Sequence, residues 1–367
     1  MNIVFLLRYI DSGGITRVVY DSSSYLEKKG HNVFIFYGKF LGNDNSFKIM
    51  LETNPGIRLI KVRGFSLQLS SIVFLPFSLL YYLYKLCVYK IDIVHVHWMS
   101  LSFVCVLSKF VLNIPFVTTT HLINKSTSSL TRFYSDGNIS ISSEITEWLN
   151  TTERVKIDNI YKVFNSVREQ DFPFISPEQR QVNKRMLGLS NDFVLLCLAR
   201  FESVKRHDII ISALDKLRDY NFVLFLAGEG NLFGEIRNLV EGKQLNDKVR
   251  FVGHVDPREL LSIADVLILT SDQEGFPMSI IEAMFSGVVP IRTSSEGALD
   301  QIINHQNGFI IEKSNVEELT SILMNIFRKE IDLDFVSARS YEYASANFDF
   351  VKNQDKIIAI YERIRNN

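Results

Sequence analysis

Residues 270–290 read TSDQEGFPMSIIEAMFSGVVP, and the order of residue types in this stretch indicates the unit from which the fold is built. An apolar run at 266–269 leads into its polar turn. A helix is predicted to begin near Met278, and a second apolar run, 288–291, follows it. Strand, loop, helix and strand in this order form the unit of a parallel sheet, which binds ligands at the carboxyl ends of its strands.

Two carboxylates of this stretch, Glu274 in the loop and Glu282 on the second turn of the predicted helix, can face one crevice. Ionised carboxylate oxygens accept strong hydrogen bonds, so this pair suits a ligand rich in hydroxyl groups. The alternative is that Glu282 only solvates the surface of a helix. Ala283 and Met284 beside it are predicted to face the core, which favours the first interpretation.

Glu274, seven intervening residues, Glu282 and the segment 283–290 resemble the donor-site motif of retaining glycosyltransferases with the GT-B fold. This type of enzyme is called glycosyltransferase family 4, or "glycosyl transferases group 1". The resemblance extends along nearly the whole chain, because several separate motifs occur in the order of the family. It implies an α/β protein with two Rossmann-like domains, each a doubly wound parallel sheet, that face a cleft.

The length of 367 residues and a hydrophobic content of 47% predict two or three domains with ample cores. The resemblance implies an acceptor domain at 1–170, a donor domain at 171–350 and a terminal helix at 351–367 that crosses back to the first domain. Apolar runs alternate with helical stretches in the second half, which by itself favours a doubly wound sheet. The strands predicted there are 193–199, 222–227, 249–252, 266–270, 288–291 and 309–311.

Near the N-terminus, the apolar run 3–7 is followed by a loop with Gly13 and Gly14 and then by a helix that ends at Gly30. Paired glycines let a backbone approach a ligand closely, and a helix N-terminus attracts phosphate. The family places such a loop against donor and acceptor, so the resemblance implies a donor-binding role for both glycines. The sequence lacks a G-x-G-x-x-G pattern here, which disfavours a nicotinamide or flavin enzyme.

Arg200 ends the predicted strand 193–199, and Lys205 follows five residues later in a polar loop. Two cations at a strand end provide what a diphosphate needs when its bond to a sugar breaks. The pattern Arg-Phe-x-x-x-Lys also matches the phosphate-binding pair of the family. No metal is then needed at the diphosphate. The segment 332–334 formally matches the cation motif Asp-x-Asp, but chance or helix capping explains it better.

The resemblance implies roles for further residues. His121 closes the predicted strand 115–120, where the family has a histidine near the donor sugar. Glu282 would hold the ribose and Glu274 the sugar hydroxyls, and the family's usual account is front-face attack with assistance to the leaving group. The implied catalytic residues are Glu274, His121, Arg200 and Lys205. The implied donor-binding residues are Gly13, Gly14, Arg200, Lys205, Gly228, Gly230, Val252, Gly253, His254, Glu274, Gly275, Phe276, Pro277, Met278, Ser279 and Glu282.

The segment 294–300 departs from the family pattern. Relatives often carry two glycines there and a glutamate three residues further on, whereas this chain has Glu296 and Asp300 in place of one glycine and that glutamate. The change can reshape the pocket near the sugar or the phosphate, so the motif does not identify the donor sugar.

Histidine and cysteine residues carry separate predictions. His95 and His97 alternate on the predicted strand 92–97 and point to one face. A metal site needs a third ligand, which is not spaced nearby, so we predict satisfied polar groups at a strand end. The three cysteines lie in apolar runs without paired spacing and are predicted to be buried, in a reducing compartment. They are Cys87, Cys105 and Cys197.

Charge is distributed unevenly along the chain. The net charge of −1 disfavours a dedicated nucleic-acid-binding protein. Residues 1–170 carry 18 basic and 12 acidic side chains, a net +6, which leaves −7 for the rest. A basic half suits an anionic partner such as a bilayer surface, and scattered surface charge is the alternative. The segment 64–84 has no charged residue, but four serines, Gln68 and Pro76 favour a packed or membrane-touching helix over a transmembrane span.

Residues 1–7 show neither a basic leader nor a cleavage site, so they are predicted to form a first strand rather than a signal peptide. We expect a cytoplasmic protein. Peripheral attachment to the inner face of the plasma membrane is the second option, because of the basic half and the uncharged segment.

The predicted function is a retaining, metal-independent hexosyltransferase that needs no cofactor. It would move a sugar from a nucleotide diphosphate sugar, with UDP-hexose or UDP-N-acetylhexosamine favoured, to a hydroxyl of a glycan or lipid-linked saccharide. Bacterial surface polysaccharide synthesis, of capsule or lipopolysaccharide, is the expected setting. The alternatives are a GT-B nucleotide-sugar epimerase and a non-catalytic sugar-nucleotide binding subunit. The intact set of Glu274, Glu282, Arg200 and Lys205 disfavours the second alternative.

Overall fold

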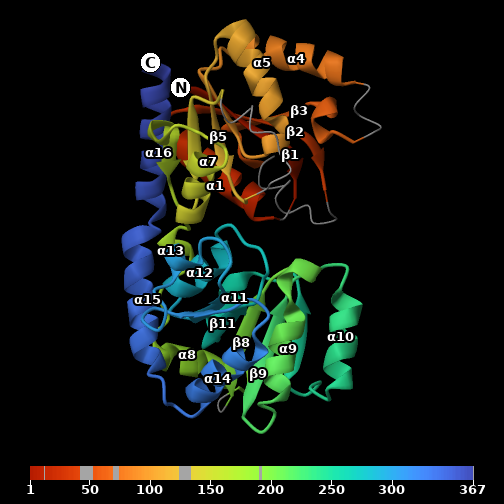
Figure 1. The fold of residues 1–367 in the computed structure, drawn as a ribbon, viewed down its shortest axis with the longest axis vertical. Coiled ribbons are helices and arrows are strands. Elements are labelled where there is room, and N and C mark those ends of the chain that lie inside the picture. The colour runs from red at the N-terminus through yellow and green to blue at the C-terminus, as the bar shows by residue number, and fades with distance from the viewer. Residues whose placement is uncertain (12, 42–52, 69–73, 124–133, 190–191, 367) are drawn as a thin grey trace. The chain divides into compact units, whose positions relative to one another are not determined.

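The computed structural model describes residues 1–11, 13–41, 53–68, 74–123, 134–189 and 192–366. They form two compact units (Figure 1). Unit 1 consists of residues 1–165 and 351–367, and unit 2 consists of residues 166–350. The domain bounds of 170 and 350 stay a prediction, because compactness alone does not show that a segment folds independently.

Unit 1 is built on a parallel sheet of seven strands in the order β3-β2-β1-β4-β5-β6-β7. Its strands are β1 Asn2–Ile10, β2 Asn32–Phe40, β3 Ile57–Lys61, β4 Ile93–Val96, β5 Phe116–Thr120, β6 Gly137–Ser140 and β7 Ile160–Lys162. Its helices are α1 Gly14–Lys28, α4 Leu75–Val88, α5 Ser102–Leu112, α7 Ser143–Thr151 and α16 Phe350–Asn366. Side chains from β1 alternate between two apolar clusters, one with α1 and α16 and one with α4 and α5, so both faces of the sheet are covered.

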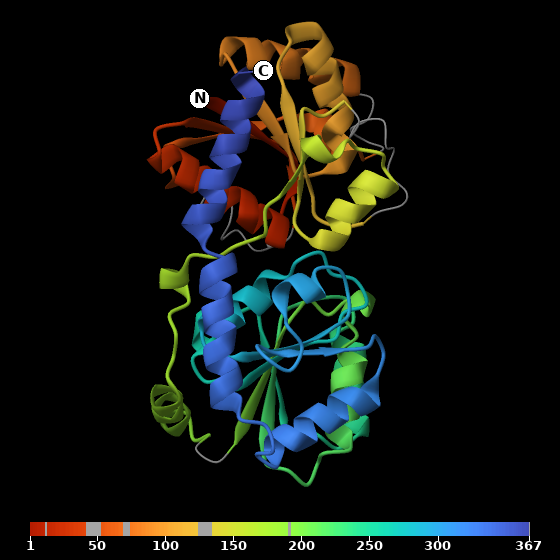
Figure 2. The ribbon, with the colours of Figure 1, turned by 60° about the vertical axis from the view of Figure 1, so that its left-hand side comes forward.

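Unit 2 is built on a parallel sheet of six strands in the order β10-β9-β8-β11-β12-β13. Its strands are β8 Phe193–Leu198, β9 Phe222–Ala227, β10 Val249–Gly253, β11 Val266–Leu269, β12 Val289–Thr293 and β13 Phe309–Ile311. Its helices are α8 Pro177–Met186, α9 His207–Asp215, α10 Phe233–Gly242, α11 Pro257–Leu261, α12 Met278–Phe285, α13 Ala298–Gln301, α14 Val316–Phe327 and α15 Leu333–Asn347. Figure 2 shows helices on both sides of this sheet. The predicted doubly wound α/β architecture is confirmed in both units.

Local sequence signals place several of these elements. Helix α12 begins at Met278, as predicted. Asp256 and Asn315 cap α11 and α14 by accepting hydrogen bonds from backbone N–H groups of the first turn. Asp332, in the Asp-x-Asp match, caps α15 in the same way, with a distance of 3.0 Å from its Oδ1 to the nitrogen of Phe335. The capping explanation for that motif is therefore confirmed.

One prediction, the burial of a cysteine on helix α4, is wrong. Cys87 was predicted to be buried, as Cys105 and Cys197 are, but it is exposed. The helix is apolar on its outward side as well as on its inward side, so an apolar run around a cysteine does not show that the cysteine faces the core. Within the described parts of the chain, no helix is long and apolar enough to cross a membrane. Part of the uncharged segment, residues 69–73, lies outside those parts.

Candidate functional site

The strand order of unit 2 places two loops beside each other. From β8 the chain continues to β9 on one side, and β11 continues to β12 on the other side. A ligand crevice forms at such a reversal point, outside the carboxyl ends of the two strands. Residues 199–206 follow β8 and residues 270–277 follow β11, so both loops flank this point.

An ion pair joins these two loops. Lys205 ends a 3-10 turn, Ser203–Lys205, and its Nζ lies 2.6 Å from Oε1 of Glu274. The two side chains are 17% and 12% exposed. Backbone contacts hold the loops together, because the nitrogen of Asp272 donates to the carbonyl oxygen of Val204 at 2.8 Å. Two predicted catalytic residues that lie 69 positions apart therefore meet at the reversal point, where they offer donors to a phosphate and acceptors to hydroxyls.

Arg206, which the sequence analysis did not identify, supports the ion pair of Lys205 with Glu274. Its backbone is in the left-handed region with φ of 50°, and its side chain donates to Asp208, Asp272 and Ser314. Hydrogen bonds to Asp208 raise the pKa of the guanidinium above its ordinary value. Asp208, two positions after Arg206, was a signal in the sequence, whereas the contact with Asp272, 66 positions away, could not be predicted from it.

Arg200, the other predicted phosphate contact, is more open than Lys205. Its side chain is 61% exposed, and its Nη1 lies 2.9 Å from Oε1 of Glu202. An ion pair between exposed groups contributes little free energy. A phosphate could therefore displace Glu202 at small cost.

The predicted donor-binding glycines after β9 have a packing role. A Cβ on Gly228 would lie 2.2 Å from the carbonyl oxygen of Ala199, and one on Gly230 would lie 2.4 Å from that of Phe201. Gly228 also has φ of +146°, which favours glycine. Both glycines thus let the loop after β9 lie directly against the loop of Arg200. This close approach explains the residue type without any ligand.

Other predicted donor-binding residues occupy the surrounding loop ends. Gly253 ends β10, and its carbonyl oxygen accepts from the nitrogen of Gly228 at 2.8 Å. His254 is exposed, and Glu282 is half-buried on α12. The ring of Phe276 is buried edge-on against Phe348 at 5.4 Å between centroids, so its side chain belongs to the core rather than to a ligand surface. Val252 lies in β10, next to its last residue, and Gly275, Pro277, Met278 and Ser279 lie in the loop after β11 or in the first turn of α12.

In unit 1 the strand order reverses between β1 and β4; Gly13 and Gly14 follow β1 beside that point, and His121 follows β5, the strand next to β4. Gly14 begins α1 and is exposed. The nitrogen of Gly13 donates to Oδ1 of Asp11 at 3.0 Å, and the hydroxyl of Thr16 donates to the same oxygen at 2.9 Å. Asp11 therefore orders the turn at the start of α1 and already uses the N–H group of Gly13.

Three histidines of unit 1 form a cluster in which the ring of His97 stacks on that of His121 and is tilted against that of His95. His95 is hydrogen-bonded through both ring nitrogens, to Tyr361 at 2.5 Å and to Thr119 at 2.7 Å. Nδ1 of His97 lies 3.0 Å from Nε2 of His121, but Nε2 of His97 is buried with no partner in the described structure. The prediction of satisfied polar groups is therefore right for His95 and wrong for His97. The strand pair β4–β5 creates the contact of His97 with His121, and strand order cannot be read from the sequence.

Burial keeps this histidine cluster neutral. It lowers the pKa of His95 to about 3 and that of His121 to about 4, and it lowers the pKa of His97 well below the ordinary value. A neutral His121 can donate or accept one hydrogen bond at its remaining nitrogen. This suits contact with a sugar hydroxyl better than charge stabilisation.

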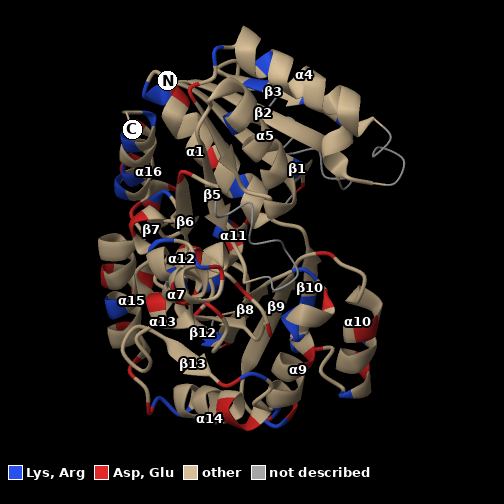
Figure 3. Cartoon of the chain, turned by 45° about the horizontal axis from the view of Figure 1, so that its top comes forward, with Lys and Arg blue, Asp and Glu red and all other residues tan. Residues whose placement is uncertain are grey.

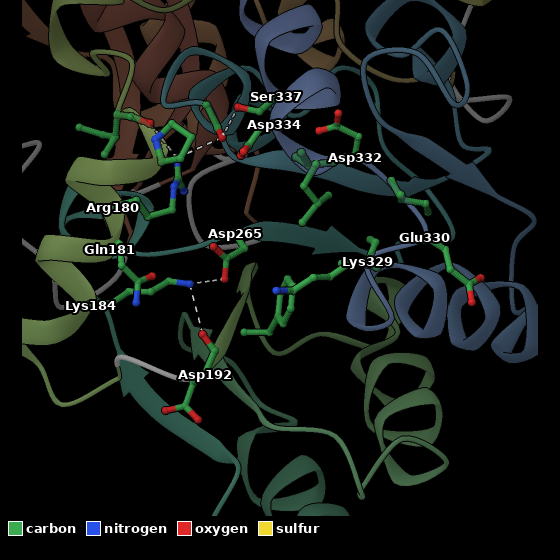
Figure 4. A pocket seen from close by; sticks show the side chains of 18 residues that line it. Arg180, Gln181, Lys184, Asp192, Asp265, Lys329, Glu330, Asp332, Asp334 and Ser337 are labelled. Carbon is green, nitrogen blue, oxygen red and sulfur yellow. Dashed lines mark hydrogen bonds and ion pairs between the residues drawn. The ribbon is translucent and has the colours of Figure 1, made fainter.

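Unit 2 also has a cavity of about 920 Å³ at the opposite edge of its sheet (Figure 4). Its wall includes Arg180, Lys184, Asp265 and Ser337, and Lys184 pairs with Asp265 at 2.5 Å. None of the predicted donor-binding residues lines it. The cavity lies at the amino ends of the strands. The candidate site lies at their carboxyl ends, where α/β sheets bind ligands.

Comparison with known proteins identifies the fold and the family. A crystal structure of HepE from Anabaena in complex with UDP has a TM-score of 0.84 and 19% identity over 99% of this chain and 100% of that one. The fold is GT-B. Residues 12–169 match the family described as Glycosyltransferase Family 4, and residues 179–347 match Glycosyl transferases group 1. The chain therefore belongs to this glycosyltransferase family, which confirms the resemblance drawn from the motifs.

Two curated relatives give further comparison. N-acetyl-alpha-D-glucosaminyl L-malate synthase of Bacillus anthracis is 26% identical over 290 residues, which is 75% of this chain and 74% of that protein. UDP-Gal:alpha-D-GlcNAc-diphosphoundecaprenol alpha-1,3-galactosyltransferase of Escherichia coli is 25% identical over 187 residues, which is 49% of this chain and 48% of that protein.

Proposed function

We propose that this glycosyltransferase is retaining and moves a sugar from a UDP-hexose or UDP-N-acetylhexosamine to a hydroxyl of a glycan or lipid-linked saccharide. The observation that carries the proposal is the Lys205–Glu274 pair at the reversal point of the unit 2 sheet. The HepE structure, which is a complex with UDP, supports the choice of base. The Escherichia coli relative, named for a UDP-galactose donor and a diphosphoundecaprenol-linked acceptor, supports the acceptor class and a setting in bacterial surface polysaccharide synthesis.

The proposed roles follow from the chemistry of each side chain. Lys205 and Arg200 stabilise the negative charge that grows on the diphosphate as its bond to the anomeric carbon breaks. Glu274 accepts hydrogen bonds from the sugar hydroxyls and Glu282 from the ribose, while His121 contacts the sugar. The acceptor oxygen attacks on the face that the diphosphate leaves, and its proton passes to the departing phosphate oxygen. The other predicted donor-binding residues contribute the surrounding loops.

We also propose that transfer needs no metal ion. A divalent cation at a diphosphate neutralises charge, and a lysine and an arginine at the same place supply equivalent charge. Glu274 already pairs with Lys205, so the site offers a diphosphate a cation rather than a carboxylate pair that would hold a metal.

The direct test is transfer in excess EDTA. The purified protein is first screened with UDP, GDP, ADP and their sugars for a rise in melting temperature, and we expect UDP and UDP-sugars to give the largest rise. The donor found in this way is then incubated with an undecaprenyl-diphosphate-linked sugar, with EDTA or with magnesium. We expect the same turnover with EDTA as with magnesium. We also expect an α-linked product from an α-linked donor. Loss of turnover in EDTA that magnesium restores would contradict the proposed phosphate site.

The same assay separates the two alternatives. An epimerase would convert the nucleotide sugar in the absence of any acceptor. A non-catalytic binding subunit would show the rise in melting temperature but neither hydrolysis nor transfer. Both outcomes would reject the transferase proposal while leaving the position of the donor site intact.

We propose that unit 1 attaches the protein to the cytoplasmic face of an anionic membrane, through the apolar face of α4 and α5. This face consists of Phe74 just before α4, Phe77, Leu80, Tyr81, Tyr84 and Val88 on α4, and Phe103, Phe110 and Val111 on α5, each at least 36% exposed. Figure 3 shows α4 mostly in the colour of uncharged residues. An exposed apolar face of this kind indicates an interaction surface, and Lys85, whose Nζ lies over the rings of Tyr81 and Tyr84 at 5.3 and 5.8 Å from their centroids, suits anionic lipids.

Flotation with vesicles tests this attachment. We expect the protein to float with phosphatidylglycerol vesicles at low salt and less so at high salt, because salt screens the lysines. The double substitution Phe77→Ser and Phe110→Ser should abolish flotation. The matched control is Phe335→Ser, which removes a phenylalanine that is 58% exposed from α15 in unit 2. Absence of wild-type binding at low salt would refute the proposal.

A further inference from the structure

Arg292 is a fully buried cation in unit 2. It precedes the last residue of β12 and is among the largest side chains with no exposed surface. Burying a guanidinium is costly unless its N–H groups are hydrogen-bonded and its charge is compensated. The partners of Arg292 therefore indicate what this residue does.

The side chain of Arg292 fixes the loop that follows β12. Its Nη2 donates to the hydroxyl of Ser295 at 2.8 Å and to the carbonyl oxygen of Glu296 at 3.0 Å. Its Nη1 donates to Oε1 of Gln301, at the end of α13. This is the segment in which Glu296 stands where the family pattern has a glycine. Its path is therefore set by side-chain hydrogen bonds, with Gly297 at φ of +74° as the one left-handed residue of the loop.

Gln301 carries the connection on to the next loop. Its Nε2 donates to the carbonyl oxygen of Pro277 at 3.0 Å, and Pro277 precedes α12 in the loop that holds Glu274. A second link lies nearby, since the hydroxyl of Thr293 donates to the carbonyl oxygen of Ser271 at 2.5 Å. Strands β11 and β12 are neighbours in the sheet, so these bonds join two adjacent loops at the ligand-binding edge.

We propose that Arg292 and Gln301 are positioning residues of the donor site. They fix the turn at Pro277 and, through it, the place of Glu274 and the first turn of α12 relative to the ligand. This inference rests on the proposed function, which places the nucleotide sugar at the same loops. A displaced turn costs affinity and rate because ligand groups and protein groups no longer meet at hydrogen-bonding distance.

The most informative substitution is Gln301→Glu. A carboxylate still accepts from Arg292, and more strongly than an amide does, so the buried guanidinium keeps its partner. The amide donor to Pro277 is replaced by an oxygen that repels the carbonyl. We expect the free protein to melt near the wild-type temperature, while the dissociation constant for UDP rises about tenfold. A merely structural role would lower the melting temperature and leave UDP affinity unchanged.

Ser295→Ala is the second variant, in case Gln301→Glu does not fold. It removes only one acceptor of Arg292, so we expect a smaller loss of UDP affinity in the same direction. The matched control is Ser337→Ala, because the hydroxyl of Ser337 donates to the carbonyl oxygen of Gly287 at 2.7 Å beyond the other end of α12, in the wall of the cavity in Figure 4. It also loses one buried hydrogen bond and should leave UDP affinity unchanged.

Three outcomes would overturn the inference. If Gln301→Glu and Ser295→Ala bind UDP as wild type does while Lys205→Ala does not, the positioning role is wrong and the donor site stands. If Gln301→Glu, Ser295→Ala and Lys205→Ala all bind UDP as wild type does, the donor site itself is misplaced. If Ser337→Ala weakens UDP binding as much as Gln301→Glu, the effect is general destabilisation of unit 2.

Discussion

Lys205→Ala is expected to weaken the binding of UDP about ten- to a hundredfold. Hydrogen bonds to charged groups contribute roughly 1.5–3 kcal/mol each, and each 1.4 kcal/mol corresponds to a factor of about ten in affinity. Transfer should fall at least as much, because the diphosphate gains negative charge as the sugar leaves and the lysine stabilises that charge most in the transition state. The measurements are the dissociation constant for UDP and the rate of transfer at saturating donor.

The ion pair seen in the structure requires a control for stability. Removing Lys205 leaves Glu274, which is only 12% exposed, without the ammonium at 2.6 Å. The free protein should therefore lose some stability, and the variant Lys205→Ala/Glu274→Gln should recover part of it without recovering UDP binding. Lys216→Ala serves as the matched surface control, since Lys216 pairs with the exposed Glu317 in the same unit. Near-normal UDP affinity in Lys205→Ala would show that the phosphate site lies elsewhere.

Sequence patterns predicted the sheet of unit 2 well because each strand of a parallel sheet is an apolar run with a clear end. Strands β9 and β13 have the predicted bounds, and β12 begins at Val289 and continues to Thr293. The extension matters for function. The added residues include Arg292. The predicted strand stops before this residue because a charged side chain is typical of a strand end, but the side chain of Arg292 is fully buried.

Contacts between loops could not be predicted in the same way. Lys205 and Glu274 were each identified from a motif, but their pairing depends on β8 lying beside β11. The network from Arg292 through Gln301 to Pro277 depends likewise on β12 lying beside β11. Motifs indicate which residues serve a ligand. Strand order decides which of them meet, and it is fixed by packing over the whole unit.

Stability is expected to fall steeply when the pH is lowered from 7.5 to 5.5. Burial lowers the pKa of His95 to about 3 and those of His121 and His207 to about 4, whereas an unfolded histidine titrates near 6.5. The unfolded chain therefore binds more protons, so this contribution is fully present above pH 6.5 and is lost as the pH falls toward the folded pKa. Each such histidine costs up to about 1.4 kcal/mol for each pH unit below 6.5.

The loss should be larger in unit 1, which holds His95, His97 and His121, than in unit 2, which holds His207. At pH 5.5 three neutral histidines amount to roughly 4 kcal/mol, a large part of the 5–15 kcal/mol typical of a folded protein. Urea unfolding at both pH values measures this, with His95→Asn expected to lower stability at pH 7.5 but to reduce its dependence on pH. The control is His305→Asn, because His305 is exposed and its φ of 63° suits asparagine. Equal stability at the two pH values would show that these histidines are not held neutral by burial.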